Sequence, residues 1–218
     1  MAPRDKAGIR ILIADDHPIV RAGLREIIAR ERDMSIAAEA QTSQEVFEAL
    51  ARQAADVLIL DVMMPGRGGM EVVKLLRQER PELPVLILSV FPEDQLAVRA
   101  LRAGAAGYLT KDSATAELVG AIRKVVGGGK YVSPSVAEKL ARELSGGTAG
   151  QAPHDKLSDR EYQILRMIVK GKTVSDIAEE LALSVKTIST YRTRMMEKLN
   201  VRTTADLVRY ALAERLVE

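Results

Sequence analysis

VLILDVMMPG, residues 57–66, places one carboxylate, that of Asp61, directly after four apolar residues and before a turn-forming stretch. Such a run is typical of a strand buried on both faces, where an ionised side chain costs free energy unless something compensates its charge. Because the carboxylate ends the run, we expect it at an edge of the sheet. A function at that edge would explain why the chain places a charge there.

Similar apolar runs recur through the first half of the chain and alternate with segments of helical periodicity. The runs read IRILIA, MSIAAEA, DVLIL, PVLILSV and AAGYLT. The helical segments are Pro18–Arg30, Thr42–Gln53, Gly69–Arg80, Glu93–Ala103 and Ala114–Val126. Five strands alternating with five helices predict an α/β fold, in which helices cover both faces of a doubly wound, five-stranded parallel sheet.

Beyond residue 128 the chain becomes rich in glycine and the strand signals end. Residues 129–155 contain one short helical segment, Ser135–Leu144, and the flexible stretch SGGTAGQAP, so we expect a linker. The string GGGK at 127–130 is not a phosphate-binding loop. That motif needs Gly at 124 and Ser or Thr at 131, where the chain has Lys124 and Tyr131.

The remaining residues, 156–218, are predicted to form a small all-α domain. Serine and threonine caps open four short helices, after Ser158, Thr173, Ser184 and Thr203. The expected domains are therefore residues 8–128 and residues 156–218, joined by the linker over residues 129–155.

Composition excludes several classes of protein. The 218 residues contain no Cys, which excludes a disulfide scaffold and a thiolate metal site. The first residues lack the features of a signal peptide, and every apolar run is shorter than the roughly 18 residues of a membrane helix. We therefore expect a cytoplasmic protein without a membrane partner. Between Ser184 and Arg202, five basic residues face one acidic residue, which makes a polyanion a candidate partner.

Polar residues follow four of the predicted strands, and they are Asp15, Asp16, Asp61, Ser89 and Lys111. Ligands of open α/β sheets bind beyond the carboxyl ends of the strands. Neighbouring carboxylates repel one another unless a cation lies between them, and oxygen ligands favour Mg²⁺. Asp61 is then a candidate nucleophile toward phosphate, with Lys111 neutralising the phosphoryl oxygens and Ser89 donating a hydrogen bond. Taken singly, each of these residues has an alternative role as a helix cap, a turn residue or a surface charge.

The strings IADDHP, LDVMMPGRGGME, LSV and GAAGYLTKD together resemble the receiver domain of two-component response regulators, over residues 8–128. The resemblance implies a flavodoxin-like fold in which Asp61 is the phosphoacceptor. Mg²⁺ would be held by Asp16, Asp61, the backbone carbonyl of Met63 and, through water, Asp15. Ser89 and Lys111 would contact the phosphate, and Tyr108 would be the aromatic residue that moves when Ser89 is drawn inward. Without the resemblance, core filling is the simpler role for Tyr108.

The segment Val185–Leu199 has the two faces of an amphipathic helix. Its apolar stripe consists of Val185, Ile188, Met195 and Leu199. A short link joins it to the preceding helix, Val174–Leu181, as in a helix-turn-helix motif, whose second helix enters the DNA major groove. The residues placed to neutralise phosphates are Lys186, Arg192, Arg194 and Lys198. An ordinary solvated helix face is the alternative.

Residues 157–212 resemble the LuxR-type DNA-binding domain, which follows receivers in the NarL/FixJ subfamily. Markers of the resemblance include Leu157, Gly171, Ile177, Leu181 and Lys198. The implied DNA contacts are Ser184, Lys186, Thr187, Ser189, Thr190, Thr193, Arg194 and Lys198. Tyr191 stands where many relatives have His, which puts a DNA role for this residue in doubt. The last helix, Thr204–Glu214, would form a dimer contact through Leu207, Val208 and Leu212.

These observations predict a DNA-binding transcription regulator rather than an enzyme. It would accept a phosphoryl group on Asp61 from a sensor histidine kinase, and would bind promoter DNA as a homodimer. One alternative is an aspartyl-phosphate hydrolase, but such enzymes typically need a second Asp two residues later, where this chain has Met63. Another alternative is a receiver that is never phosphorylated and only mediates dimer contacts.

Overall fold

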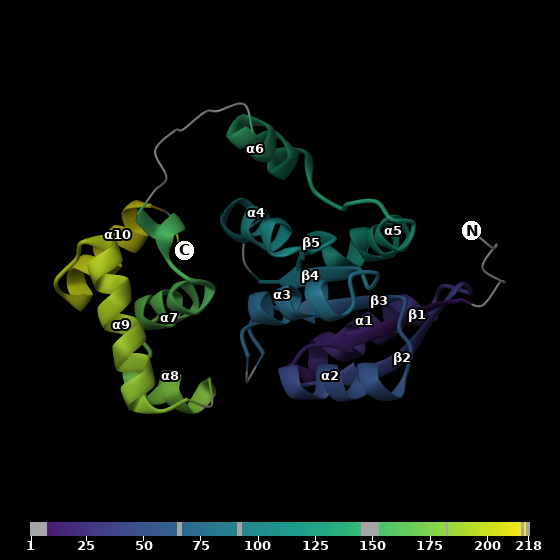
Figure 1. The fold of residues 1–218 in the computed structure, drawn as a ribbon, viewed down its shortest axis with the longest axis horizontal. Helices are drawn as coiled ribbons and strands as arrows, with labels where there is room; N and C mark the ends of the chain where they lie inside the picture. Colours follow the sequence, from purple (N-terminus) through teal and green to yellow (C-terminus); the bar gives the residue numbers. More distant parts are fainter. Residues whose placement is uncertain are drawn as a thin grey trace. The chain divides into compact units, whose positions relative to one another are not determined.

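The computed structural model describes residues 8–64, 67–90, 93–144, 153–181, 183–214 and 216. The chain divides into two compact units, Met1–Arg142 and Glu143–Glu218. The first unit contains strands and helices, and the second is helical in the part that the structure describes (Figure 1).

The first unit is built on a five-stranded parallel sheet, which confirms the predicted fold class (Figure 1). Its strand order is β2-β1-β3-β4-β5. The strands are β1 (Ile9–Ala14), β2 (Met34–Ala40), β3 (Val57–Asp61), β4 (Val85–Ser89) and β5 (Gly107–Thr110). Each strand runs in the same direction as its neighbours, so the residues that end the strands lie along one edge.

Helices follow each strand, and they match the predicted segments closely. They are α1 (Pro18–Ala29), α2 (Ser43–Arg52), α3 (Gly69–Glu79), α4 (Glu93–Ala103) and α5 (Ala114–Val126). Pro18 suits the first turn of α1, where its missing N–H has no helical partner to lose. Thr42 caps α2, since its side chain accepts a hydrogen bond from the backbone N–H of Glu45.

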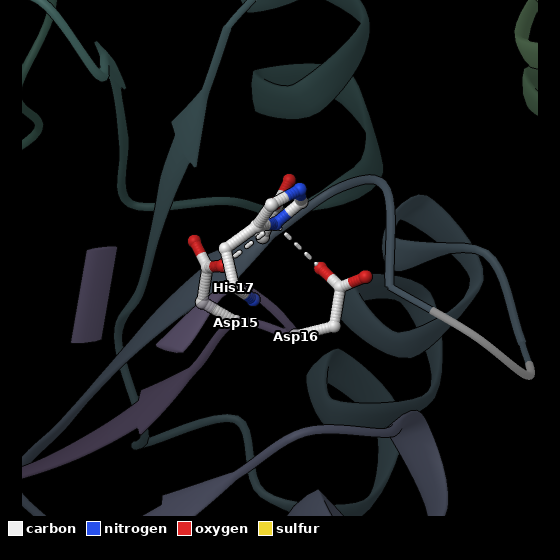
Figure 2. Close-up of side chains that lie close together, drawn as sticks. Asp15, Asp16 and His17 are labelled. Carbon is white, nitrogen blue, oxygen red and sulfur yellow. Dashed lines mark hydrogen bonds and ion pairs between the residues drawn. The ribbon is translucent and has the colours of Figure 1, made fainter. Parts of the chain in front are cut away.

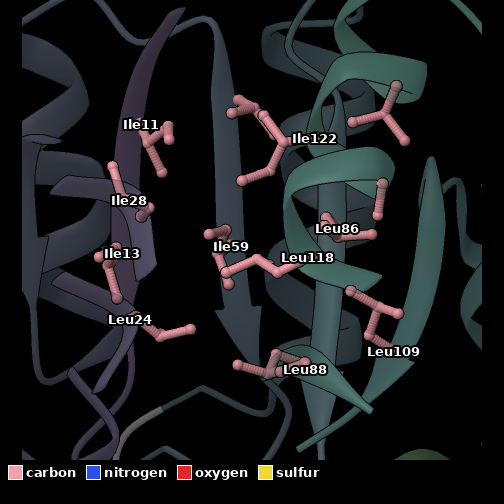
Figure 3. Packing of buried hydrophobic residues seen from close by; sticks show 14 of the residues in the cluster. Ile11, Ile13, Leu24, Ile28, Ile59, Leu86, Leu88, Leu109, Leu118 and Ile122 are labelled. Atoms are coloured by element: carbon pink, nitrogen blue, oxygen red, sulfur yellow. The ribbon is translucent and has the colours of Figure 1, made fainter. Parts of the chain in front are cut away.

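The core between the sheet and the helices α1 and α5 is aliphatic (Figure 3). The strands contribute Ile11, Ile13, Ile59, Leu86, Leu88 and Leu109, and the helices contribute Leu24, Ile28, Leu118 and Ile122. All five residues of β3 are buried, since helices also cover the opposite face of the sheet. This burial on both faces explains why the strand reads as an uninterrupted apolar run before Asp61.

The first unit continues past residue 128, because part of the predicted linker packs on it. Tyr131 pairs in parallel with Gly107 at the outer edge of β5, and its backbone N–H donates to the carbonyl oxygen of Ala106 over 2.9 Å. The Tyr131 hydroxyl donates to Oε2 of Glu117 on α5, over 2.7 Å. Helix α6 (Pro134–Leu144) follows. The stretch SGGTAGQAP lies mostly outside the described residues.

The second unit is helical, as predicted. It comprises a short 3-10 turn η1 (Pro153–Lys156) and the helices α7 (Asp159–Val169), α8 (Val174–Glu180), α9 (Val185–Leu199) and α10 (Thr204–Ala213). Capping boxes open α7, α8 and α10, each with a Ser or Thr cap and an acidic residue three positions later. Of the four residues of the apolar stripe on α9, Ile188, Met195 and Leu199 are buried, whereas Val185 is 51% exposed. Val185 is the first residue of α9.

Candidate functional site

The predicted site residues of the first unit do converge at one edge of the sheet. Asp15 directly follows β1, Asp61 ends β3, and Ser89 ends β4. Lys111 directly follows β5, and its backbone N–H donates to the Ser89 carbonyl oxygen over 2.7 Å. Asp15 and Asp61 are 1% and 2% exposed, so both carboxylates are almost removed from water.

The Lys111 ammonium lies between the two buried carboxylates. Its Nζ is 2.6 Å from Oδ2 of Asp15 and 2.7 Å from Oδ2 of Asp61. The other Asp61 oxygen, Oδ1, accepts a hydrogen bond from the backbone N–H of Met63 over 2.9 Å. The Asp61 carboxylate is therefore held by the Met63 amide of the turn after β3 and by the ammonium of Lys111, which directly follows β5.

Burial and charge act in opposite directions on this pair. Burial raises the pKa of Asp61, although attraction to Lys111 offsets part of the effect. For Lys111, burial opposes the charged form, but its attraction to Asp61 and its contacts with Asp15 outweigh burial and raise its pKa. The carboxylates of this pocket therefore stabilise positive charge, which Lys111 supplies in part and a divalent cation would also supply.

A wider cluster surrounds this pair. Asp15, Asp16, His17 and Asp61 each offer one ligand atom, and these atoms lie within 4.8 Å of one another. Figure 2 shows the imidazole of His17 turned toward both neighbouring carboxylates, with Nδ1 3.1 Å from Oδ1 of Asp15 and 2.8 Å from Oδ1 of Asp16. His17 is not among the residues predicted from the sequence, although its place directly after two aspartates was a usable signal.

The donor set fits a hard divalent cation. Two buried carboxylate oxygens, Oδ2 of Asp15 and Oδ1 of Asp16, accept no hydrogen bond of ordinary geometry from the described residues. Oδ2 of Asp15 instead pairs with the Lys111 ammonium, whereas Oδ1 of Asp16 lies only beside His17, and a buried carboxylate oxygen without a hydrogen bond is suited to coordinate a metal ion. The predicted contribution of the Met63 carbonyl stays a prediction.

Arg21 supports the site from α1 and was also missed in the sequence. Its Nη1 donates to the backbone carbonyl oxygen of Asp15 over 2.7 Å, and its Nε donates to Oε2 of Glu39 over 3.1 Å. The side chain is largely buried and ties the turn after β1 to β2. Arg21 and Glu39 are 18 residues apart, and no pattern in the sequence indicates that they pair.

Tyr108 is buried in β5, and its backbone contacts the segment that follows α5. Its N–H donates to the Tyr131 carbonyl oxygen over 3.3 Å. Gly107, directly before Tyr108, has no space for a side chain. An added Cβ would lie 2.8 Å from both Cβ and the carbonyl oxygen of Tyr131. The predicted movement of Tyr108 stays a prediction.

In the second unit, α9 presents most of the predicted DNA-binding residues to solvent. Ser184, Lys186, Ser189, Thr190, Thr193, Arg194 and Lys198 are exposed, and Thr187 is half-buried. The hydroxyls of Thr190 and Thr193 donate to helix carbonyls one turn earlier, those of Lys186 and Ser189. Rotation about χ1 would free these hydroxyls for another partner.

Lys198 has a partner that the sequence did not indicate. Its Nζ lies 2.6 Å from Oε2 of Glu161, the buried acidic residue of the α7 capping box. Burial disfavours the charged form of Glu161, but the hydrogen bonds from Lys198 and Ser158 outweigh burial and lower its pKa. Lys198 therefore stabilises the packing of α9 on α7, whatever else it contacts.

The residues predicted for a dimer contact on α10 differ in exposure. Leu207 is 0% exposed and belongs to the interior of the second unit, so its side chain has no surface to offer a second copy. Val208 is half-buried and Leu212 is 56% exposed. The candidate surface is therefore reduced to Val208 and Leu212.

Within the part of the chain that the structure describes, no helix has the length and hydropathy required to cross a bilayer.

Comparison with known proteins assigns the two halves of the chain to two domain families. Residues 11–123 match the response regulator receiver domain, and residues 155–211 match the luxR family of bacterial regulatory proteins. Both matches coincide with the regions where the resemblance was seen in the sequence.

Three known proteins show how far the similarity extends. The chain is 38% identical over 210 residues to the response regulator GacA of Pseudomonas viridiflava, covering 96% of this chain and 98% of GacA. A structure of the Salmonella typhimurium response regulator RcsB is 28% identical, with a TM-score of 0.69 and coverage of 94% and 98%. RcsB from Salmonella enterica serovar Typhimurium, bound to promoter rprA in the presence of phosphomimetic BeF3-, is 27% identical, with a TM-score of 0.64 and coverage of 93% and 98%.

Proposed function

This chain belongs to the two-component response regulators that join a receiver domain to a LuxR-type DNA-binding domain, and we propose that phosphorylation of Asp61 by a sensor histidine kinase controls its binding to promoter DNA. The family consists of transcription regulators rather than classical enzymes. The observation that carries the proposal is the buried Asp61 carboxylate, which contacts Lys111 at the carboxyl edge of the sheet. We propose residues 8–128 as the receiver, 129–155 as the linker, whose first residues pack on the receiver through Tyr131, and 156–218 as the DNA-binding domain.

The proposed chemistry is transfer of a phosphoryl group to Asp61. Oδ1 of Asp61 is held by the Met63 amide, which leaves Oδ2 to attack phosphorus once Lys111 shifts its N–H donors to a phosphoryl oxygen. As the O–P bond forms, the bond from phosphorus to the donor's histidine nitrogen breaks, and the imidazole leaves with the electron pair and takes up a proton from solvent. Ser89 then donates a hydrogen bond to a second phosphoryl oxygen, and buried Tyr108 follows its movement.

Mg²⁺ is the proposed cofactor, held by Asp16, Asp61, the Met63 carbonyl and, through water, Asp15. When bound, it supplies the positive charge that offsets repulsion between the carboxylates and the phosphoryl group. The buried Oδ1 of Asp16, which accepts no hydrogen bond from the described residues, supports this assignment.

The second unit is proposed to bind DNA through α9. RcsB, which this chain matches over 93% of its length, has been solved bound to a promoter. In this chain the exposed cations Lys186 and Arg194 are suited to phosphates, with Thr187 beside them. The hydroxyl-bearing residues Ser184, Ser189, Thr190 and Thr193 are suited to base edges or phosphates. Lys198 is also retained as a proposed phosphate contact, made by a cation that already pairs with Glu161.

We propose that the DNA-bound form is a homodimer. Leu212 is one of the few large apolar side chains exposed on the described surface, and Val208 lies one turn earlier on the same helix. Leu207 supports this helix from the interior.

Selection from a random DNA library tests the whole proposal. Full-length protein is incubated with Mg²⁺ and acetyl phosphate, or without them, and Asp61→Asn protein is treated in parallel. We expect intact-mass measurement to show one added phosphoryl group in the wild type and none in the variant. The treated wild type should enrich a symmetric motif that the other samples do not.

Two results would contradict the proposal. Equal recovery of the same motif in all samples would refute control by phosphorylation, while leaving DNA binding intact. Recovery of only salt-sensitive, sequence-independent fragments would refute promoter recognition.

A further inference from the structure

His17 is placed to act on whatever cation the acidic pocket holds. It is the residue directly before α1, and its side chain is 59% exposed, so the ring lies at the mouth of the pocket rather than in the core. Its backbone N–H donates to Oδ1 of Asp15 over 2.8 Å, which fixes the turn that carries both residues. In Figure 2 the ring turns Nδ1 toward the two aspartates.

The spacing of these atoms matches that of ligands around one small cation. Nδ1 of His17 is 2.8 Å from Oδ1 of Asp16 and 3.1 Å from Oδ1 of Asp15. Ligands at right angles around a metal, each at about 2.1 Å, are about 3 Å apart. One cation could therefore contact Nδ1 of His17 and Oδ1 of Asp16 with little rearrangement, and Asp15 would hold it through water as in the proposed site.

The hydrogen bonding of the cluster also indicates a ligand. Oδ1 of Asp16 is buried and lies 2.8 Å from Nδ1 of His17, yet the two do not have hydrogen-bond geometry. Asp15, 1% exposed, already has partners: its Oδ2 pairs with the Lys111 ammonium at 2.6 Å, and its Oδ1 is hydrogen-bonded with Nδ1 of His17 over 3.1 Å, a bond that Nδ1 would exchange for a cation. A cation between His17 and Asp16 would satisfy Oδ1 of Asp16, which accepts no hydrogen bond from the described residues.

We propose that His17 is an additional metal ligand, so that the pocket binds first-row transition ions such as Ni²⁺ and Co²⁺ more tightly than Mg²⁺. An imidazole nitrogen adds little for Mg²⁺, which prefers oxygen, but adds substantially for Ni²⁺, Co²⁺ and Zn²⁺. The inference rests on the proposed cation site of the receiver and names the class of ion that this site selects.

Metal titration of the untagged full-length protein at fixed pH tests this selectivity. Ni²⁺ and Mg²⁺ are titrated separately by calorimetry into the wild type, His17→Asn and His17→Ala, the first of which keeps a residue favoured before a helix. The chain has two histidines, so His154→Asn in the second unit is a matched control. We expect His17→Asn to weaken Ni²⁺ binding about tenfold or more, and Mg²⁺ binding less than about threefold. His154→Asn should change neither affinity.

A spectroscopic readout accompanies the affinities. Because only His17 and His154 contribute imidazole signals, addition of Zn²⁺ should shift the ring signals of His17 and leave those of His154 in place. Equal losses of Ni²⁺ and Mg²⁺ affinity in both His17 variants, no loss for either ion, or unshifted His17 signals would overturn the inference. Phosphoryl incorporation on Asp61 with Mg²⁺ is measured on the same samples. If it persists when the Ni²⁺ result fails, this inference is refuted and the proposed function is not.

Discussion

Replacing Lys111 by Met is expected to destabilise the first unit, because it leaves two buried carboxylates without the ammonium that contacts both. The Lys111 side chain is 12% exposed, so water screens its interaction with Asp61 only weakly. Removing one partner from a buried ion pair costs about 3–5 kcal/mol. Because the Met63 amide still holds Asp61, we expect a loss near the lower limit, about 3 kcal/mol.

The loss should depend on pH in a defined direction. Burial already raises the pKa of Asp61 in the wild type, and removal of Lys111 raises it further. A carboxyl group whose pKa is higher in the folded state favours that state while the pH is below its unfolded pKa of 3.8. This contribution to stability is lost as the pH rises through the folded pKa. The difference between the variant and the wild type should therefore be small near the unfolded value and largest at neutral pH.

Hydrogen exchange of the amides in β3 and β4 measures the stability of the first unit separately from the second. Lys74→Met, at an exposed position on α3, is the matched control and should change stability little. Saturating Mg²⁺ should recover part of the loss in Lys111→Met, because the ion supplies the missing positive charge. A loss below about 1 kcal/mol at neutral pH, or an equal loss in acid, would refute this account of the pocket.

Three further perturbations have defined outcomes. Lys198→Met should destabilise the second unit by about 1–2 kcal/mol in urea unfolding, because Glu161 is then buried without its cation. Unchanged stability would show that the ion pair contributes nothing. Arg194→Ala should weaken DNA binding and reduce the magnitude of the slope of log affinity against log salt concentration by about 0.9. DNA titrations at several salt concentrations measure this slope, and an unchanged slope would exclude a phosphate contact. Gly107→Ala should lower the free energy of unfolding of the first unit by about 1–3 kcal/mol and release Tyr131 from β5. Limited proteolysis after Lys130 would detect the release, and unaltered cleavage would show that the pairing survives.

Much of the first unit could be predicted from sequence because its signals are local. An apolar run such as the one before Asp61 indicates a strand buried on both faces, and a cap such as Thr42 marks the start of a helix. Parallel strands then bring their ends to one edge, so Asp61 and Lys111 could be expected to meet, as they do at 2.7 Å. Local pattern and topology were sufficient for this part of the site.

Other contacts depend on distant residues and left no trace in a single sequence. Tyr131 belongs to a glycine-rich segment without strand periodicity, and its pairing with Gly107 depends on space at the edge of β5. Lys198 has the sequence context of a DNA-binding cation, yet it pairs with Glu161, 37 residues earlier. Charge patterns identify a basic surface, but they do not identify which cation is engaged within the fold.

The geometry of the pocket also constrains how Lys111 and a divalent ion share it. The ammonium contacts Asp15 and Asp61, two of the carboxylates available to a cation. An incoming ion therefore competes with Lys111, which predicts only modest metal affinity before phosphorylation. A phosphoryl group on Asp61 adds negative oxygens, so the ion and the ammonium no longer need the same carboxylate oxygens. Metal and phosphoryl group should then stabilise each other's binding, because each reduces the competition that the other faces.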